Sequence, residues 1–540
     1  MKSTTRGSLS RRDELQAATA TRRRFLTGTG ASAGLALTGA LSGLHASPAE
    51  ARTPSTSDNL FTLGVASGDP LPHAVVIWTR LAPQPFEPYG GLDPVNVPVQ
   101  WQVSEDEQFR RIVRSGEAMA RPEYAHSVHV DVQGLRPWRH YFYRFRVGSQ
   151  VSPTGRTRTA PRGVQRPDAI RLAVASCQKW DDGFYLAHRD IAERDHDLVF
   201  FVGDYIYESH IKPEGGVRGG ARPDVVDREP MTLDEYRFRY TVHKMDPDLQ
   251  AAHASAAWVV TLDDHEVEDN WASTHSQKLE TPEFMVRRAN ALRAYWEHMP
   301  LRTAQLPRGP EMPLYRQVRY GQLANFLVLD TRQHRSPIVA DGDWVAPNEE
   351  SADPARTITG DAQEQWLLAR AGRSNPVWTV LVQQVVMAHL DKLAGPGELS
   401  PMSTWDGYSA SRDRVLGGLT DRDVDNLVVL TGDIHQNFAS DLKRDFYDPD
   451  SPVIGAEFIT TSISSKGDGQ DETQWGQTIL GECPHLKFHN DQRGYISCLV
   501  TPEEWFADYR VAERVSTNTG TVTSRAEFVT EAGDPGVLPA

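Results

Sequence analysis

With 540 residues, 39% of them hydrophobic and 24% charged, the chain has the composition of a globular protein; this excludes a disordered or membrane-embedded one. The formal net charge of −15 disfavours a specific nucleic-acid partner, because a polyanion is repelled unless a local positive centre intervenes. The length exceeds what one hydrophobic core usually serves, so two folded domains are expected. Three cysteines are too few for a disulfide framework.

Residues 1–51 have the pattern of an export signal. A twin arginine precedes Phe25 and Leu26, a weakly apolar segment rich in Gly, Ala, Thr and Ser follows, and residues 49–51 offer a small-residue cleavage site. The alternative, a transmembrane helix, is disfavoured by the interrupting glycines and hydroxyl groups. The sequence therefore predicts a twin-arginine (Tat) signal peptide, the Tat export machinery as a partner, a secreted protein, and no transmembrane span in the mature chain.

An all-β domain is predicted for residues 59–159. Short segments alternate between apolar and polar residues there, separated by Pro, Gly and acidic turns, at 74–80, 97–103, 127–132 and 141–147. This pattern is typical of an antiparallel sandwich. The segment 135-LRPWRHY-141 resembles the tyrosine corner of fibronectin-like and immunoglobulin-like domains. We expect a packing or shielding module without chemistry of its own.

After a Pro-rich linker at 160–169, the pattern of residues 170–540 changes to buried strands alternating with helices. Nearly continuous apolar segments occur at 170–176, 197–203, 256–263, 325–330, 377–386 and 426–433. Segment 362–372 has the pattern of a helix. Continuous apolar strands are typical of a sheet that is covered on both faces. The second domain is therefore predicted to be α/β and to contain the active site.

Polar residues follow several of these strands directly. They are Cys177, Asp204, Tyr207, Asp263, Asp264, His265, Asp433 and His435. In open α/β sheets, ligands bind beyond the carboxyl ends of the strands. Each group alone is weak evidence, because a Gly-Asp is often a turn and a single Cys is often buried as a small hydrophobe. Together they predict cations, since gathered carboxylates repel one another and are costly to bury unpaired.

The types of ligand narrow the choice of metal. Thiolate, phenolate, carboxylate and imidazole together suit a transition ion, whereas sites made only of oxygen suit Ca²⁺, Mg²⁺ or Mn²⁺. A phenol has an ordinary pKa of about 10 and needs a strongly polarising ion to bind as its anion, so Tyr207 indicates Fe³⁺. Zinc motifs are absent: 265-HEVED-269 has Asp at the last position, and no Cys-x-x-Cys occurs.

As a set, SCQ, GDYIYE, 246-DPDLQAAHA-254, 262-LDDHEVEDNWA-272, 330-DTRQHR-335 and 431-TGDIHQ-436 resemble the D-type alkaline phosphatases (PhoD). The related streptomycete phospholipase D shares these motifs, and both are grouped with the purple acid phosphatases among the metallophosphoesterases. The resemblance extends over nearly the whole chain. It implies a metallophosphoesterase-like sheet sandwich covered by helices, and secreted hydrolysis of phosphate mono- and diesters.

The resemblance also implies two metal sites. Fe³⁺ would be held by Cys177, Asp204, Tyr207 and His435. Asp204 would bridge to a second ion, Ca²⁺ or else Mn²⁺ or Mg²⁺, bound by Asp263, Asn270 and Asp433, with the choice between Asp263 and Asp264 left open. The family more often has Trp where this chain has Leu262, and Asn-Asn where it has Asp269–Asn270.

These residues predict a hydrolytic mechanism. A phosphate between two cations would be neutralised and attacked by an acidified water. His265 could protonate the leaving oxygen, and Arg332 and Arg335 could bind phosphate oxygens, although surface ion pairing is an equal alternative for both arginines. The substrate could be a small molecule, a phospholipid or a teichoic-acid-like polymer.

Three alternatives stay open at this point. The enzyme could be a phospholipase D acting on phosphatidyl head groups. From a different class, it could be an exported binding protein whose ions are structural. Cys177 could be a nucleophile, but the neighbouring acids would raise its pKa. Cys483 and Cys498 could pair after export, but the apolar segment 495–500 favours burial of Cys498.

Overall fold

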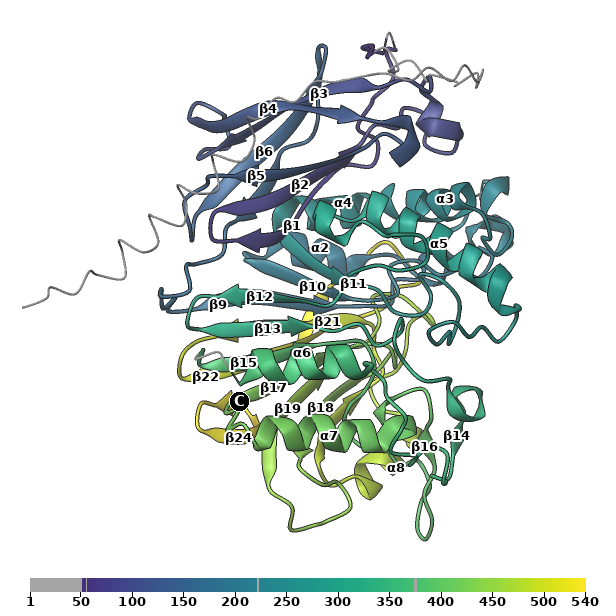
Figure 1. Ribbon diagram of the computed structural model, residues 1–540, viewed down its shortest axis with the longest axis vertical. Helices are drawn as coiled ribbons and strands as arrows, with labels where there is room; N and C mark the ends of the chain where they lie inside the picture. The colour runs from purple at the N-terminus through teal and green to yellow at the C-terminus, as the bar shows by residue number, and fades with distance from the viewer. Residues whose placement is uncertain (1–50, 55, 221–222, 373–375) are drawn as a thin grey trace, which may run out of the picture. The chain divides into compact units, whose positions relative to one another are not determined.

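The computed structural model describes residues 51–540 except 55, 221–222 and 373–375, and three β-sheets make up most of its framework (Figure 1). The predicted signal peptide lies outside the described residues, apart from Ala51. Within the described part of the chain, no helix is both long and apolar enough to cross a membrane.

The N-terminal strands form the predicted all-β sandwich. One sheet of it is five-stranded and antiparallel, with β3 (Val97–Ser104), β4 (Ile112–Ala120), β6 (His140–Val147), β7 (Gln150–Val151) and β8 (Gly155–Arg158). Its buried face packs against apolar residues of three more strands, β1 (Val65–Leu71), β2 (Ala74–Arg80) and β5 (Ser127–Gln133), in one shared core. The tyrosine corner is present, because the Tyr141 hydroxyl accepts a hydrogen bond from the Arg136 backbone N–H at 2.9 Å.

A ten-stranded sheet joins this sandwich to the α/β part of the chain. Its order is β24-β23-β22-β21-β9-β10-β11-β1-β2-β5. The strands are β1 (Val65–Leu71), β2 (Ala74–Arg80), β5 (Ser127–Gln133), β9 (Ile170–Ala175), β10 (Leu198–Val202), β11 (Ala257–Thr261), β21 (Gly494–Val500), β22 (Glu504–Ala512), β23 (Val522–Glu531) and β24 (Asp534–Pro539). Because β1 pairs in parallel with β11, N-terminal strands extend the same sheet that carries the site.

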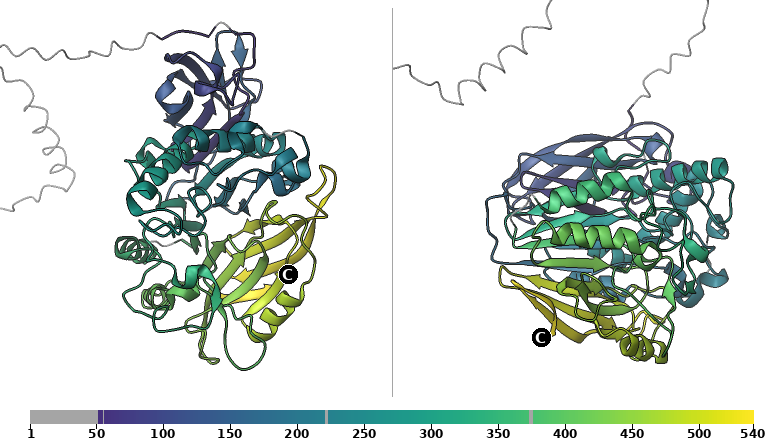
Figure 2. Two further views of the ribbon diagram at one scale, coloured as in Figure 1. Left: turned by 90° about the vertical axis from the view of Figure 1, so that its right-hand side faces the viewer. Right: turned by 60° about the horizontal axis from the view of Figure 1, so that its bottom comes forward.

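A seven-stranded sheet faces the ten-stranded one. Its order is β12-β13-β15-β17-β19-β18-β20. The strands are β12 (Arg316–Tyr320), β13 (Ala324–Val328), β15 (Trp378–Val382), β17 (Leu427–Thr431), β18 (Asn437–Lys443), β19 (Val453–Ile459) and β20 (Leu486–Asn490). A short pair, β14 (Trp344–Val345) and β16 (Ser400–Pro401), lies apart. The C-terminal strand lies beside β18 (Figure 2), where the Val537 N–H donates to Asp441 at 2.8 Å.

The side chains of β10 show why its sequence is continuously apolar. Leu198, Phe200 and Val202 point into the core between the two large sheets. Val199 and Phe201 point to the other face, against helices. Both faces of β10 are therefore buried away from water, as the absence of apolar–polar alternation in this segment predicted.

Helices cover the outer faces of both sheets (Figure 1). Those on the ten-stranded sheet are α2 (Leu186–Glu193), α3 (Leu233–Lys244), α4 (Pro247–Ser255) and α5 (Thr281–His298). Those on the seven-stranded sheet are α6 (Asp361–Ala371), α7 (Ser409–Thr420) and α8 (Gln474–Glu482). The helix predicted at 362–372 is α6. The fold is thus a helix-covered sheet sandwich preceded by an all-β domain, which confirms the predicted class.

Candidate metal centre and active site

The central strands of both sheets run parallel, and this places their carboxyl ends at a common edge. β9, β10 and β11 are parallel neighbours, and so are β13, β15, β17 and β19. Cys177, Asp204, Asp263 and Asp433 each follow one of these strands by one or two residues. Polar residues far apart in the sequence therefore meet beyond one edge, as ligands do in other parallel sheets.

The backbone is strained at several of these positions. Cys177, Asp204, Asp433 and His435 have φ angles of 59°, 57°, 65° and 61°, in the left-handed region that residues other than glycine rarely adopt. Such strain costs on the order of 1 kcal/mol or more per residue and is concentrated at functional sites.

Gly203 makes the turn into Asp204 possible. Its φ is 106°, and a Cβ built on it would lie 2.3 Å from the Asp263 Cβ. No other residue fits at this position, because two strand-end loops approach each other there. The Gly-Asp of the GDYIYE motif is therefore needed to bring β10 and β11 together at the site.

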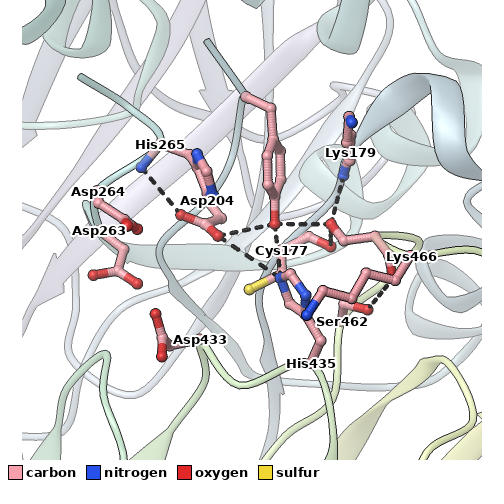
Figure 3. Close-up of polar contacts among 12 residues, drawn as sticks. Cys177, Lys179, Asp204, Asp263, Asp264, His265, Asp433, His435, Ser462 and Lys466 are labelled. Carbon is pink, nitrogen blue, oxygen red and sulfur yellow. Dashed lines mark hydrogen bonds and ion pairs between the residues drawn. The ribbon is translucent and has the colours of Figure 1, made fainter. Parts of the chain in front are cut away.

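The first group of potential metal ligands contains Cys177, Asp204 and His435, whose ligand atoms all lie within 4.8 Å of one another (Figure 3). The Tyr207 hydroxyl completes it. It donates to Asp204 Oδ2 at 2.9 Å, and it lies 2.9 Å from His435 Nε2. Ser465 Oγ, 2.8 Å away, donates to the phenol oxygen. Thiol, carboxyl, phenol and imidazole thus face one another in one buried position.

The second group is almost entirely carboxylate. Asp263, Asp264 and Asp433 offer ligand atoms within 4.8 Å of one another, and Asp204 forms a further group with Asp264 and His265. Asp204 therefore belongs to the first group and also adjoins the second, as a bridging ligand would. Both adjacent carboxylates, Asp263 and Asp264, face the site, so the structure brings the two alternative ligands together.

Arg332 is the cation inside this acidic group. It is fully buried, its Nε–H donates to Asp263, and its second amino group lies 3.2 Å from Asp433 and 3.4 Å from Asp264. Arg335 is also buried, with its guanidinium over the Tyr408 ring and a hydrogen bond to the Ser403 carbonyl. Neither arginine forms a surface salt bridge in this structure.

Asn270 lies at the margin of the second group. Its φ is 54°, and its backbone N–H donates to Asp264 Oδ2 at 2.8 Å. Its side-chain amide lies close to Gly342, where a Cβ would come within 3.3 Å of the amide nitrogen. The hydrogen bond fixes the direction of the Asp264 carboxylate.

Burial controls the protonation of these groups. It raises the pKa of Asp204, Asp263 and Asp433, with neighbouring carboxylates adding to the effect and Arg332 opposing it at the last two. Burial and Asp204 raise the pKa values of Cys177 and Tyr207. For Asp264, burial alone would raise the pKa, but Arg332 and His265 more than offset it. In the absence of cations several of these groups are therefore protonated. Each of them must lose its proton before it can bind a metal ion.

The donor set fits cations. Asp263 Oδ2 and His435 Nδ1 are buried and have no hydrogen-bond partner among the described residues, and leaving such atoms unpaired is costly. The first group combines S, N and O donors, as transition ions prefer, and the second offers oxygen donors, as Ca²⁺, Mg²⁺ and Mn²⁺ prefer. Both groups are thus candidate metal-binding sites.

His265 lies beside both groups and has a carboxylate partner that sequence reasoning missed. Its Nδ1 is 2.7 Å from Oε2 of Glu208, which is itself buried. Burial lowers the pKa of His265, but Glu208 and Asp204 outweigh it and raise that pKa. The pKa of Glu208 falls to about 2, because His265 outweighs the effect of burial. Glu208 is the last residue of the GDYIYE motif. Its place in that motif was the sequence signal that could have identified it as a site residue.

Glu266 is a second residue that the sequence did not reveal. Its two carboxyl oxygens accept hydrogen bonds from the backbone N–H groups of Asp204, Tyr205 and Asp263. It is fully buried. One side chain therefore fastens the loop after β10 to the loop after β11, and so sets the spacing of the two acidic strand ends.

A helix-covered α/β sheet sandwich with acidic residues and histidines gathered at one edge is typical of the metallophosphoesterases, and this places the protein in that class. Residues 172–509 match the PhoD-like phosphatase family, and residues 46–161 match the PhoD-like phosphatase N-terminal domain. The chain belongs to the PhoD-like phosphatase family. It is a phosphoric ester hydrolase of the alkaline phosphatase D type.

Two relatives support this assignment. Alkaline phosphatase D of Bacillus subtilis (strain 168) is 44% identical over 521 residues, which cover 96% of this chain and 88% of the relative. A solved structure of PhoD superposes with a TM-score of 0.87 at 45% identity, over 90% of this chain and 93% of that one. Both similarities extend over 90% or more of this chain.

Proposed function

We propose that this phosphatase hydrolyses phosphate mono- and diesters at the site described above, with Fe³⁺ and a second divalent ion. Cys177, Asp204, Tyr207 and His435 would hold Fe³⁺. Asp204, Asp433, Asn270 and one of Asp263 and Asp264 would hold Ca²⁺, or else Mn²⁺ or Mg²⁺. The meeting of a phenol, a thiol and an imidazole around Asp204 carries this proposal, because no structural role requires that combination.

Bound ions of this kind supply Lewis-acid polarisation of the ester and acidification of a water molecule. The chain supplies the rest. His265 lies within reach of the first-group residues, with its ring 4.2 Å from that of Tyr207, and its Nε2 would donate the proton that the leaving oxygen needs. Glu208 accepts the Nδ1–H and raises the pKa of His265, which favours the imidazolium form, and only this form carries a proton on Nε2 to give to the leaving oxygen.

Arg332 holds the carboxylates of the second group at fixed positions before ions bind. Its ion pairs with Asp263, Asp264 and Asp433 offset their mutual repulsion. For Arg332 to bind phosphate oxygens as well, it would have to release one of these partners when an ion enters. Arg335 is also buried, and its positive charge interacts with the carboxylates of Asp263 and Asp264.

We also propose that the protein is secreted through the Tat pathway, on the basis of residues 1–51. That route exports folded proteins, so the ions could be loaded before export. The N-terminal β-domain would then serve as a packing module, with the predicted boundaries at residues 59, 159 and 170.

The test is metal analysis combined with turnover. The enzyme is purified without chelators, its metals are counted, and its activity is measured on p-nitrophenyl phosphate, bis-(p-nitrophenyl) phosphate and phosphatidylcholine vesicles. We expect about one iron per chain, hydrolysis of both nitrophenyl esters, and loss of activity with a chelator that added Fe³⁺ and Ca²⁺ restore. Full activity without iron would overturn the iron assignment. Turnover of phosphatidylcholine alone would show a phospholipase, and turnover of none of the three would favour a binding protein with structural ions.

A further inference from the structure

The loop after β19 reaches the metal centre from the side opposite the acidic group, and it carries one lysine, Lys466. Ser465, the preceding residue, has its hydroxyl oxygen 2.8 Å from both the Tyr207 oxygen and the Cys177 carbonyl oxygen, and its single proton can be donated to either. The backbone N–H of Lys466 donates to Asp182 at 3.1 Å. These hydrogen bonds fix the lysine backbone against the turn that carries Cys177.

The backbone conformation of Lys466 is strained. Its φ is 69°, in a region that disfavours any side chain with a Cβ, and Gly467 immediately follows with a φ of 74°. A glycine at position 466 would relieve the strain, yet a lysine occupies it. Strained residues of this kind are concentrated where their side chain has a role.

The Lys466 side chain lies on the same side of the centre as His435 and Ser462 (Figure 3). The backbone at Lys466 is held close to the His435 ring, because the Ser465 hydroxyl lies 2.8 Å from the Tyr207 oxygen, which lies 2.9 Å from His435 Nε2. Lys466 is exposed, and among the residues that the structure describes no carboxylate lies within ion-pair distance of it. Its charge is therefore available to a ligand.

The other cations of the centre already have carboxylate or carbonyl partners, except that Arg335, which is buried, pairs with no carboxylate among the described residues. Arg332 pairs with three carboxylates. Lys179 also lies near the centre (Figure 3), and its ammonium nitrogen is 3.8 Å from a carboxylate oxygen of Asp182. Arg493 is buried and bonds to the His435 carbonyl and to Asp491. Lys466 is thus the cation of the centre best placed to meet an incoming anion.

We propose that Lys466 contacts a terminal, non-bridging oxygen of the substrate phosphate and favours monoesters over diesters. This inference rests on the proposed hydrolysis at this site. A monoester at alkaline pH has two negative charges and three terminal oxygens, whereas a diester has one charge and two such oxygens. A lone ammonium group above the first-group residues adds more binding energy to the dianion, because the attraction scales with charge.

The experiment compares the metal-loaded wild type with Lys466→Met, Lys466→Arg and Lys466→Gly on p-nitrophenyl phosphate and its bis-ester. We expect Lys466→Met to lose about tenfold or more in kcat/KM on the monoester, mainly through KM. Its loss on the diester should be several-fold smaller. Lys466→Arg should recover part of the monoester activity, because it keeps the charge. Lys487→Met, which removes an ammonium paired with Asp441, is the matched control and should resemble the wild type.

Binding of inorganic phosphate, measured by calorimetry on the same metal-loaded proteins, tests the contact without turnover. Lys466→Met should bind phosphate about tenfold more weakly than the wild type. Equal losses on both esters, unchanged phosphate binding, or full activity of Lys466→Gly would overturn the proposal. A wild type that binds phosphate through Lys466 yet hydrolyses neither ester would refute the proposed function and leave the contact standing.

Discussion

His265 and Glu208 are joined by a hydrogen bond of 2.7 Å across 57 positions of the sequence. The pair couples the loop after β11 to the end of the GDYIYE turn after β10. Because Glu208 has a pKa of about 2 in this contact, it stays anionic over the working range and keeps a proton on His265. A fixed carboxylate behind an imidazole both orients the ring and raises its basicity.

We therefore expect Glu208→Gln to lower kcat by about 10- to 100-fold while iron content stays near that of the wild type. Loss of the negative charge lowers the pKa of His265, so the alkaline limb of the kcat/KM profile should move to lower pH. Steady-state kinetics from pH 6 to 10 check both effects. The exposed Glu311→Gln is the control, and a Glu208→Gln profile that overlays the wild type would contradict the assigned role of His265.

Tyr207 and Tyr205 lie in one turn but face different surroundings. Tyr207 contacts Asp204 and His435, whereas the Tyr205 hydroxyl lies 2.8 Å from His253 Nε2 on the helix side of the sheet. If iron binds the Tyr207 oxygen, Tyr207→Phe should abolish the visible phenolate-to-iron band and lower the iron content. Tyr205→Phe removes the same atom two residues away and should keep the colour. A coloured Tyr207→Phe enzyme would rule out this phenolate as a ligand.

The potential ligands could be predicted from the sequence because each one directly follows an apolar strand, and parallel strands share an edge. That rule alone was enough to predict that Asp204, Asp263 and Asp433 lie at the same edge. Glu266 could not be found in this way, since two of its three partners are backbone N–H groups 61 and 62 positions away, and no residue type marks an N–H as unpaired. In the same way, alternation predicted β2 and β5 as strands, but it indicated neither β1 nor the pairing of β1 with β11.

Replacement of Glu266 should uncouple the two loops that it joins. Glu266→Ala leaves three buried N–H groups unpaired, and each costs about 1–3 kcal/mol, so the free energy of unfolding should fall by about 3 kcal/mol or more. Activity should fall with it, because the spacing of Asp204 and Asp263 is released. Urea unfolding measures the first effect and ester hydrolysis the second. Glu193→Ala, an exposed change at the end of α2, should alter neither, and a stable, fully active Glu266→Ala would show that this side chain does not hold the loops.

Lys244, at the C-terminal end of α3, is a buried cation without a carboxylate partner among the described residues. Its ammonium lies 4.4 Å from the centre of the Trp78 ring and 3.4 Å from His253 Nε2. Burial lowers its pKa from the ordinary 10.5 to about 7. Between these two values the unfolded chain holds a proton that the folded chain does not. Stability should therefore rise with pH across this window, by up to about 1.4 kcal/mol per pH unit.

Lys244→Met removes that proton from both states, so its unfolding free energy should depend less on pH between 7 and 10 than that of the wild type. The two curves should differ most near pH 7, where the variant is the more stable protein, and converge near pH 10. Urea unfolding at fixed metal content gives the difference directly. Lys278→Met removes an exposed ammonium that pairs with Glu229 and should follow the wild type. Parallel curves for Lys244→Met and the wild type would mean that Lys244 keeps its proton in the folded protein, stabilised by the aromatic rings of Trp78 and Tyr205.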